Sequence, residues 1–376
     1  LHRGQSSIVY HGPRLVKRQV SDTLSFHEST NMSAEVAEVQ LQVRFITKQE
    51  QYAVPDSPYA IQSNVQVADL NTLINALILS GCYDNSIHIW STKGQHKLAI
   101  PGHTSPVKAV SWVSLDADQA VFVSGSHDQS AMLWVWNVPR NSVDCVVTCR
   151  GHEKGIECLA VSADASRFAT GSWDNNVNLW STSLAEEENV PAKKKSKPEH
   201  GKAREPLTTL KGHREAVSGV QWMDYNTVLS SGWDHLLKLW DCELGGIKQE
   251  IAGNKAFFDA DWSPLNNSII TASADRHIRL YDPRSTESIV KTTFTSHTGW
   301  VQSVRWSKTR DTLFLSAGYD GQVKLWETRS PRTPLYDLSG HEDKVLCCDW
   351  SNPSLLVSGS CDNTLRIFKA KHYQTA

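Results

Sequence analysis

Seven copies of one short pattern run through most of the chain and restrict its fold. In each copy an aspartate stands six residues before an aromatic residue and four residues after a serine or threonine. Successive aspartates are separated by 44, 46, 60, 41, 45 and 42 residues. A period in the low forties with a turn between two strands is typical of β-propellers built from four-stranded blades. The pairs are Asp84 and Trp90, Asp128 and Trp134, Asp174 and Trp180, Asp234 and Trp240, Asp275 and Tyr281, Asp320 and Trp326, and Asp362 and Phe368.

Most copies also carry a histidine 21 to 25 residues before the aspartate, in a Gly-His or Ser-His pair. These residues resemble the WD-repeat family over residues 79–370. The expected fold is therefore an all-β, seven-bladed WD-repeat β-propeller. Four copies have all four polar groups: His103, Ser124, Asp128 and Trp134; His152, Thr170, Asp174 and Trp180; His213, Ser230, Asp234 and Trp240; and His297, Ser316, Asp320 and Trp326.

Serine, histidine and aspartate together are also the groups of a hydrolase triad. A catalytic triad occurs once in a protein, whereas this set recurs with a fixed relation to a tryptophan. The WD-repeat resemblance implies a structural role, in which the aspartate holds the histidine, the histidine meets the hydroxyl and the hydroxyl receives the indole N–H. We therefore expect no catalytic residue, no cofactor and no metal, and the chain is not expected to be an enzyme.

Three copies depart from the pattern. The fifth has Gly253 at the expected histidine position and ends in Tyr281, and the last ends in Phe368. We expect these two blades to be held more by packing than by the polar chain. The first copy has neither a histidine nor a recognisable strand upstream of Asp84, which predicts an incomplete first blade.

The region before the repeats has a different pattern. Residues 1–31 lack hydrophobic periodicity and are interpreted as a disordered or non-native leader, the alternative being a genuine disordered extension. Residues 39–47 alternate as a strand, and apolar residues follow at helical spacing. This order predicts the N-terminal half of an α+β ubiquitin-like domain over residues 32–78. The helical residues are Val67, Leu70, Leu73, Ile74 and Leu77.

A partial ubiquitin-like start followed by seven repeats is similar to the WD-repeat subunits of PeBoW complexes. The strings VRFITK, AVPDSPYAI, GCYDNSIHIW, GHREAVSGVQWMD, SADRHIRLYDPR and YDLSGHEDKVL carry this resemblance. It implies a non-catalytic scaffold that binds the block-of-proliferation protein and Pescadillo, acts on the pre-60S particle and its ribosomal RNA, and resides in the nucleolus and nucleoplasm. It also implies a contact between the ubiquitin-like domain and the AAA ATPase midasin, and a deletion between Ile78 and Leu79 that puts this contact in doubt.

Two further sets of residues are candidates for binding. The residue before each turn aspartate is expected near one rim of the propeller. The aromatic residues at this position are candidates for binding a partner, the alternative being ordinary packing residues. A polar stretch, residues 183–206, is expected to be a disordered insertion between the third and fourth blades. Its lysines are a candidate nuclear import signal or a solvated charge run. The rim residues are Tyr83, Trp173, Trp233 and Tyr319, and the lysines are Lys193, Lys194, Lys195 and Lys197.

Composition narrows the remaining function classes. The net charge of -2 gives no overall attraction for nucleic acid or a membrane surface. No apolar run reaches the ~18 residues of a membrane span, so no membrane partner is expected. The eight cysteines form no C-x-x-C pair and are interpreted as reduced thiols. An alternative function, the substrate receptor of a ubiquitin ligase, would need a docking module that the sequence does not display.

Overall fold

The computed structural model describes residues 77–116, 118–184, 202–284 and 290–370, together with five short strands between residues 6 and 62. All the regular secondary structure in these parts of the chain is β-strand. The chain divides into two compact units, Leu1–Ile74 and Asn75–Ala376. The second unit contains seven sheets, and the predicted seven-bladed all-β propeller is thereby confirmed.

The first unit holds one sheet with the strand order β4-β1-β2-β3-β5. β1 and β2 are parallel, and the other pairs are antiparallel. Two of these strands, β1 and β2, lie in the range 1–31, which is interpreted from the sequence as a disordered or non-native leader. The strands are β1 (Ser6–His11), β2 (Leu24–His27), β3 (Gln40–Val43), β4 (Ile46–Thr47) and β5 (Tyr59–Gln62).

The prediction of a helix is wrong at the C-terminal end of that segment. Most of its residues lie outside the described part of the chain, but Leu77 and Ile78 belong to the strand β6. Leu77 packs against the core beside the first sheet, together with Leu79. Because a run of adjacent apolar residues fits a buried strand as well as a helix end, the sequence pattern alone did not separate the two.

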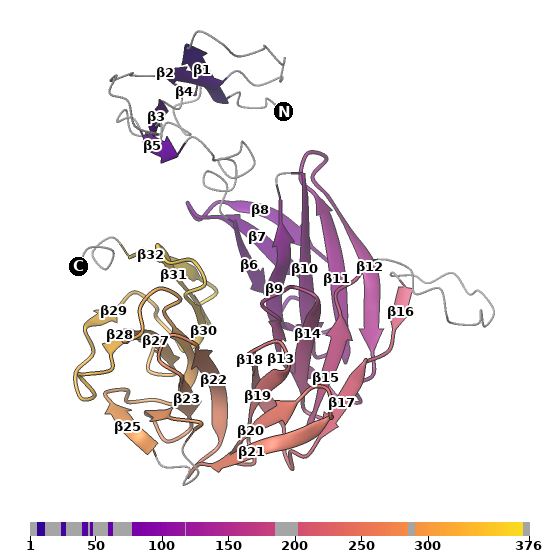
Figure 1. Ribbon diagram of the computed structural model, residues 1–376, viewed down its shortest axis with the longest axis vertical. Coiled ribbons are helices and arrows are strands. Elements are labelled where there is room, and N and C mark those ends of the chain that lie inside the picture. The colour runs from indigo at the N-terminus through magenta and orange to yellow at the C-terminus, as the bar shows by residue number, and fades with distance from the viewer. Residues whose placement is uncertain are drawn as a thin grey trace, which may run out of the picture. The chain divides into compact units, whose positions relative to one another are not determined.

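The seven sheets follow one another in chain order around the propeller (Figure 1). The first three contain β6 (Leu77–Gly81), β7 (Ile87–Ser91) and β8 (His96–Ile100); β9 (Val107–Leu115), β10 (Gln119–Ser126), β11 (Ser130–Asn137) and β12 (Ser142–Arg150); and β13 (Ile156–Val161), β14 (Arg167–Ser172), β15 (Asn176–Ser181) and β17 (Thr208–Lys211). The fourth and fifth contain β18 (Val217–Trp222), β19 (Thr227–Gly232), β20 (Leu236–Asp241) and β21 (Gly246–Ala252); and β22 (Phe257–Ser263), β23 (Ser268–Ser273), β24 (His277–Tyr281) and β25 (Val290–Thr295). The last two contain β26 (Val301–Trp306), β27 (Leu313–Gly318), β28 (Val323–Glu327) and β29 (Tyr336–Leu338); and β30 (Val345–Asp349), β31 (Leu355–Ser360) and β32 (Leu365–Lys369).

In the six sheets that follow the first, the inner strand of each sheet packs against the inner strand of the next. This row runs through β9, β13, β18, β22, β26 and β30. The first sheet, β6-β7-β8, has no strand in the inner position among the described residues, and the last, β30-β31-β32, has none in the outer position. The sequence prediction of an incomplete first blade agrees with this arrangement.

The core lies between neighbouring sheets. Trp306 from β26 and Trp326 from β28, for example, are buried with Ile270 of the preceding sheet. The repeated tryptophans are thus hydrophobic fillers of the space between blades, and their burial supplies much of the driving force for folding.

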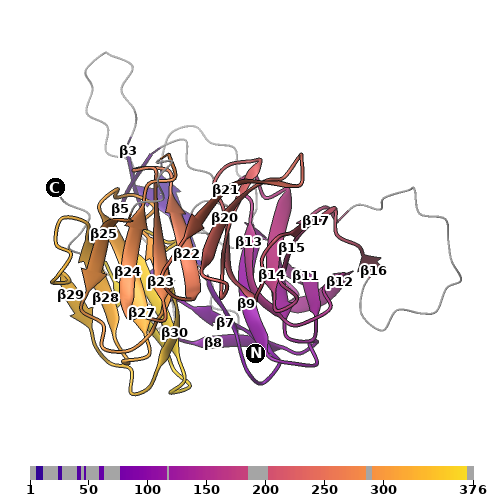
Figure 2. The ribbon, with the colours of Figure 1, turned by 90° about the horizontal axis from the view of Figure 1, so that it is seen from below.

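The range 183–206, expected to be disordered, contains a strand at its end. β16 (Lys202–Arg204) pairs in parallel with the outer strand β12 and gives the second sheet a fifth strand (Figure 2). The guanidinium of Arg204 donates hydrogen bonds to the carbonyls of Ser181 and Ser183. The expectation of disorder is therefore corrected for residues 202–204. The four lysines of the candidate import signal lie outside the described residues.

Candidate functional site: a polar-supported aromatic face of the propeller

The turn aspartate has the same backbone role in all seven sheets. One carboxylate oxygen accepts the N–H of the residue two positions later, for example Ser86 at 2.8 Å and Asn176 at 2.9 Å. The residue between them adopts a left-handed conformation, with φ between 60° and 74°. Aspartate is favoured in such turns because its side chain replaces a backbone acceptor. Each aspartate therefore fixes the turn that carries the rim residue before it.

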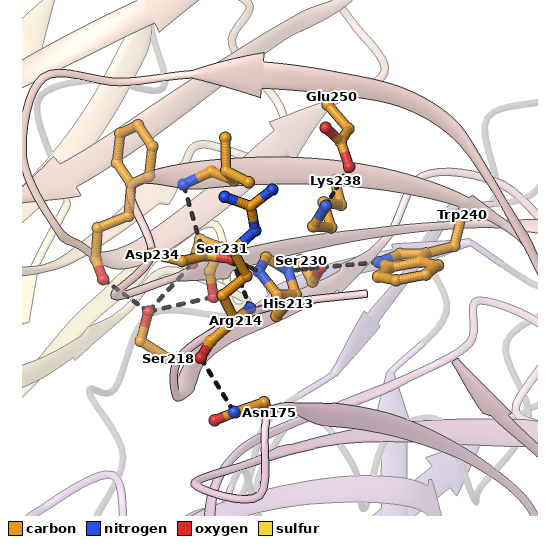
Figure 3. Close-up of polar contacts among 12 residues, drawn as sticks. Asn175, His213, Arg214, Ser218, Ser230, Ser231, Asp234, Lys238, Trp240 and Glu250 are labelled. Carbon is orange, nitrogen blue, oxygen red and sulfur yellow. Dashed lines mark hydrogen bonds and ion pairs between the residues drawn. The ribbon is translucent and has the colours of Figure 1, made fainter. Parts of the chain in front are cut away.

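In the fourth sheet the four polar groups form one chain (Figure 3). Nδ1 of His213 is 2.9 Å from Asp234, and its Nε2 is 2.7 Å from Oγ of Ser230. The indole N–H of Trp240 donates to the same Oγ at 2.7 Å. Because Ser230 accepts from the indole, its hydroxyl proton is available to the histidine Nε2, and the histidine then donates from Nδ1 to the carboxylate. One neutral tautomer satisfies every group.

The same chain occurs in three other sheets. Histidine Nδ1 lies 2.7, 2.8 and 2.8 Å from the aspartate, and the other two links measure 2.7 to 2.8 Å. The structure thus brings together all sixteen residues that the sequence grouped. The three further sets are His103, Ser124, Asp128 and Trp134; His152, Thr170, Asp174 and Trp180; and His297, Ser316, Asp320 and Trp326.

The carboxylates of these chains are held ionised. Burial alone would raise the pKa of Asp320, but the hydrogen bonds from His297 and from the N–H of Thr298 lower the pKa to about 2. The pKa values of Asp174 and Asp234 are lowered by the same kind of contacts, against the same cost of burial. The polar groups of these chains already form hydrogen bonds with one another within the sheet, so they offer no free base or nucleophile for chemistry.

The fifth sheet fills the histidine position with an apolar ring. A Cβ on Gly253 would lie 2.2 Å from Cζ of Phe257, so the ring of Phe257 occupies the space beside this glycine. Phe257 meets Tyr281 edge to face at 6.4 Å between centroids, close to the 6.1 Å between His213 and Trp240. The expectation that this blade is held more by packing than by the polar chain agrees with this pair.

The first and last sheets keep part of the polar chain. In the last sheet His341 lies 2.9 Å from Asp362 and 2.8 Å from Ser358, and only the indole is missing. This sheet was expected to be held more by packing than by the polar chain, and it keeps two of the three polar links. In the first sheet the indole of Trp90 donates to Ser80 at 2.8 Å.

Near the turns that these aspartates fix, aromatic rings form a continuous row that we call the aromatic arc. It comprises Trp173, Trp233, Phe258, Trp300 and Tyr319. Successive ring centroids are 4.7, 6.2, 5.6 and 5.5 Å apart. Trp300 is 49% exposed, and the other four are partly buried. Such spacings are those of favourable aromatic pairs, so each ring holds its neighbour in place.

A partly buried carboxylate, that of Glu157, organises one end of the arc. Oε2 of Glu157 accepts the indole N–H of Trp173 at 3.0 Å and lies 3.0 Å from Nε2 of His127. Its other oxygen is 3.1 Å from the ammonium of Lys108, which also donates to the hydroxyl of Tyr83 at 3.2 Å. Burial would raise the pKa of Glu157, but these contacts lower it to about 2. The carboxylate therefore stays charged and fixes the rings around it.

Three of the four sequence-predicted rim residues, Trp173, Trp233 and Tyr319, are members of the aromatic arc. The fourth, Tyr83, is linked to it by a hydrogen bond from Lys108. Sequence reasoning missed two members, Phe258 and Trp300. Neither precedes a turn aspartate. Phe258 is the second residue of β22 and Trp300 directly precedes β26, so the two residues occupy different positions of their repeats and no single repeat position identifies both.

The fold and its repeated polar chain define a WD-repeat β-propeller protein. The family model described as "WD domain, G-beta repeat" matches residues 94–135, 143–181, 204–241, 247–282, 288–327 and 332–369. Each match begins near the last strand of one sheet and covers the first three of the next. A second family model, the NLE (NUC135) domain, matches residues 41–86.

Three relatives are similar along almost their whole length. Each bears the name ribosome biogenesis protein WDR12 homolog. The protein from Culex quinquefasciatus is 46% identical over 410 residues, covering 89% of this chain and 96% of the relative. Those from Anopheles gambiae and Drosophila mojavensis are 44% and 46% identical, covering 89% and 90% of this chain and 96% and 97% of the relatives. The chain therefore belongs to the WDR12 family of WD-repeat proteins.

The aligned stretch of 410 residues is longer than the 376 residues of the chain, so the relative carries residues that have no counterpart here. None of the eight cysteines, all of which lie in described parts of the chain, forms a disulfide. Within those parts no helix has the length and apolar character needed to cross a membrane.

Proposed function

We propose that this chain acts in ribosome biogenesis as a non-catalytic scaffold of a PeBoW-type complex. In this proposal it binds the block-of-proliferation protein and Pescadillo and supports maturation of large-subunit ribosomal RNA on the pre-60S particle in the nucleolus and nucleoplasm. Membership of a family whose members are named for ribosome biogenesis supports the general role. The observation that carries the scaffold role is the aromatic arc, in which each ring contacts the next and Glu157 holds Trp173 by a hydrogen bond.

The arc has the properties of a protein-binding surface. Tryptophan and tyrosine contribute most to protein interfaces because they bury large areas with little loss of side-chain freedom. The arc is preorganised, since Glu157 holds Trp173 and each ring packs on the next. Preorganised anchors reduce the entropy cost of association. We therefore assign the arc, with Tyr83 beside it, as the surface that binds the block-of-proliferation protein.

The midasin contact is proposed only for chains with a complete ubiquitin-like domain. A carboxylate from that domain would complete the coordination of the divalent ion of midasin. The residues of the relative that have no counterpart in this chain, together with the lack of an inner strand in the first sheet among the described residues, support a deletion between Ile78 and Leu79. A chain with this deletion is expected to assemble with its partners but to fail at the midasin-dependent release step.

The arc is tested by a double substitution, Trp173→Ala with Trp233→Ala. Loss of two central anchors should reduce recovery of the block-of-proliferation protein with the tagged chain by about tenfold or more. The matched control is Tyr225→Ala, because Tyr225 is 70% exposed but lies in the turn at the opposite end of β19 from Trp233. Unchanged recovery with the double variant would exclude the arc as the binding surface.

Purification of the unchanged chain tests the wider proposal. Pre-ribosomal factors are expected to accompany it, and large-subunit ribosomal RNA precursors should accumulate when it is depleted. If cullin-type ligase subunits are recovered in place of pre-ribosomal factors, the scaffold proposal is wrong and the chain is a ligase receptor.

A further inference from the structure

The turn of the first sheet differs from the six other turns at two positions. It has the sequence CYDNSIH from Cys82 to His88. At the position of Cys82 the other turns have serine or glycine, and at the position of His88 they have methionine, asparagine, lysine or arginine. Both differences place a metal-ligating side chain near the turn aspartate, Asp84. No other turn of the seven has a thiol, a carboxylate and an imidazole within one seven-residue stretch.

The structure brings the three side chains together. The ligand atoms of Cys82, Asp84 and His88 all lie within 4.8 Å of one another, and no other group of three such residues in the described parts of the chain does so. Nε2 of His88 is 3.1 Å from Oδ2 of Asp84. The His88 side chain is 18% exposed and that of Asp84 is 52% exposed. The cluster is therefore shielded at the imidazole and open to solvent at the carboxylate.

A second histidine lies behind the first. Nε2 of His96, on β8, is 3.0 Å from Nδ1 of His88, the ring nitrogen that faces away from Asp84. The edge-to-face contact between Trp90 and His96, at 4.8 Å, holds the outer ring in place. A metal-binding histidine commonly donates its second N–H to a neighbouring acceptor, and this bond fixes the tautomer that leaves the other nitrogen free for the metal. His96 is placed to accept that hydrogen bond.

We infer that this cluster binds a zinc ion through Sγ of Cys82, a carboxylate oxygen of Asp84 and Nε2 of His88. Thiolate, carboxylate and imidazole are the ligands that Zn²⁺ takes in proteins. Bond lengths of about 2.0–2.3 Å put tetrahedral ligand atoms roughly 3.3–3.8 Å apart, so the widest separation here closes by about 1 Å. The fourth position faces solvent at Asp84 and takes water.

Zinc binding changes the protons of the cluster. The Cys82 thiol releases its proton to solvent, because the thiolate is the ligand. His88 carries its proton on Nδ1, donates it to Nε2 of His96, and presents the lone pair of Nε2 to the ion. The ion then replaces the N–H between His88 and Asp84. It joins the turn to β7 in a sheet whose aspartate, like Asp275 of the fifth sheet, has no upstream histidine among the described residues.

The experiment titrates the reduced full chain, free of chelators, with Zn²⁺ in a calorimeter and with Co²⁺ in a spectrophotometer. We expect one ion per chain. Bound Co²⁺ should show the d–d bands of a tetrahedral site and a thiolate-to-cobalt charge-transfer band. The melting temperature should rise with Zn²⁺ concentration, because the ion binds the folded state.

The variants use residues that other turns already carry, so they are compatible with the fold. Cys82→Ser introduces the residue found at Ser172, and His88→Asn introduces the residue found at Asn178. Cys82→Ser should abolish the charge-transfer band, and each variant should lower zinc affinity by more than about 100-fold. His96→Leu should lower it by about 10–100-fold, the usual effect of losing a supporting hydrogen bond. Cys361→Ser, which removes an exposed thiol in the last turn, is the control and should bind as the unchanged chain does.

Two results would overturn the inference. One is the absence of a one-to-one ion in the unchanged chain. The other is equal zinc binding by the unchanged, Cys82→Ser and His88→Asn chains. Either would mean that His88 and Asp84 form only a hydrogen bond that stabilises the turn.

Discussion

The fourth and fifth sheets build the same turn on different chemistry. In the fourth, His213 lies between the turn and Ser230, and the indole of Trp240 completes the chain. In the fifth, the ring of Phe257 fills the corresponding space against Tyr281. Both arrangements place one ring beside another at similar centroid distances, 6.1 and 6.4 Å, so the blade requires a filled space there, and the polar chain is one of two ways to fill it.

The two sheets also pair the turn aspartate differently. Asp234 meets a histidine from the previous loop, which links the turn to the start of the inner strand. Asp275 meets the guanidinium of Arg279, four residues later in the same hairpin. The fourth sheet therefore ties distant parts of the repeat together through polar groups, whereas the fifth relies on Phe257 for that link. This difference predicts where each sheet is most sensitive to substitution.

The largest effect is expected for Phe257→Ala. The side chain is 1% exposed and fills the position that histidine takes elsewhere, so its removal leaves a cavity. We expect a loss of about 3–5 kcal/mol in the free energy of unfolding. Urea titration followed by tryptophan fluorescence measures it. Phe258→Ala, the adjacent and partly buried ring on the same strand, is the matched control and should cost clearly less; equal losses would contradict the role given to Phe257.

A smaller effect is expected for Ser230→Ala in the fourth sheet. The substitution leaves the indole N–H of Trp240 and Nε2 of His213 without their shared partner, at a cost of about 1–3 kcal/mol. Ser263→Ala is the control, because its hydroxyl is also buried but has no hydrogen-bond partner in the described parts of the chain. The control should be neutral or slightly stabilising. A comparable loss in both variants would show that hydroxyl burial, and not the polar chain, determines the result.

The smallest effect is expected in acid. The pairs between aspartate and histidine stabilise the folded chain, and this contribution to the free energy of unfolding is lost at low pH. The pKa of Asp320 falls from an ordinary 3.8 to about 2 in the folded chain. A lowered pKa means that the folded state binds fewer protons, so the contribution is complete above pH 3.8 and disappears as the pH falls toward 2. Urea midpoints measured across this range should fall less steeply for Asp320→Asn than for the unchanged chain. An identical slope would show that Asp320 is not among the groups responsible.

Much of this structure could be predicted from the spacing of a few residues. The seven aspartates marked the turns, and the residues around them identified four complete polar chains, because buried polar groups must find partners at fixed distances. The same spacing could not identify Phe257 as a substitute for histidine, since it lies four residues after Gly253 and reaches back through space. A pattern of single positions detects a missing residue but does not show what fills its place.

Two other features depended on contacts that the sequence does not display. Leu77 and Ile78 fit a helix end and a strand equally well, and only pairing with β7 decides between them. β16 was hidden in a charged stretch because its backbone pairing with β12, rather than apolar side chains, makes it a strand. Phe258 and Trp300 joined the aromatic arc for a similar reason, since neighbouring rings come from different repeats.

The matched repeats are offset from the sheets by one strand, and this offset affects which insertions and deletions the fold can accommodate. Each matched repeat ends one strand before its sheet is complete, so every sheet except the last draws its outer strand from the following repeat. Gain or loss of one whole repeat therefore changes the number of blades while leaving every remaining sheet with its usual strands. An insertion or excision of any other length interrupts a sheet at the join. Gene rearrangements in this family are thus expected to be tolerated in steps of one repeat.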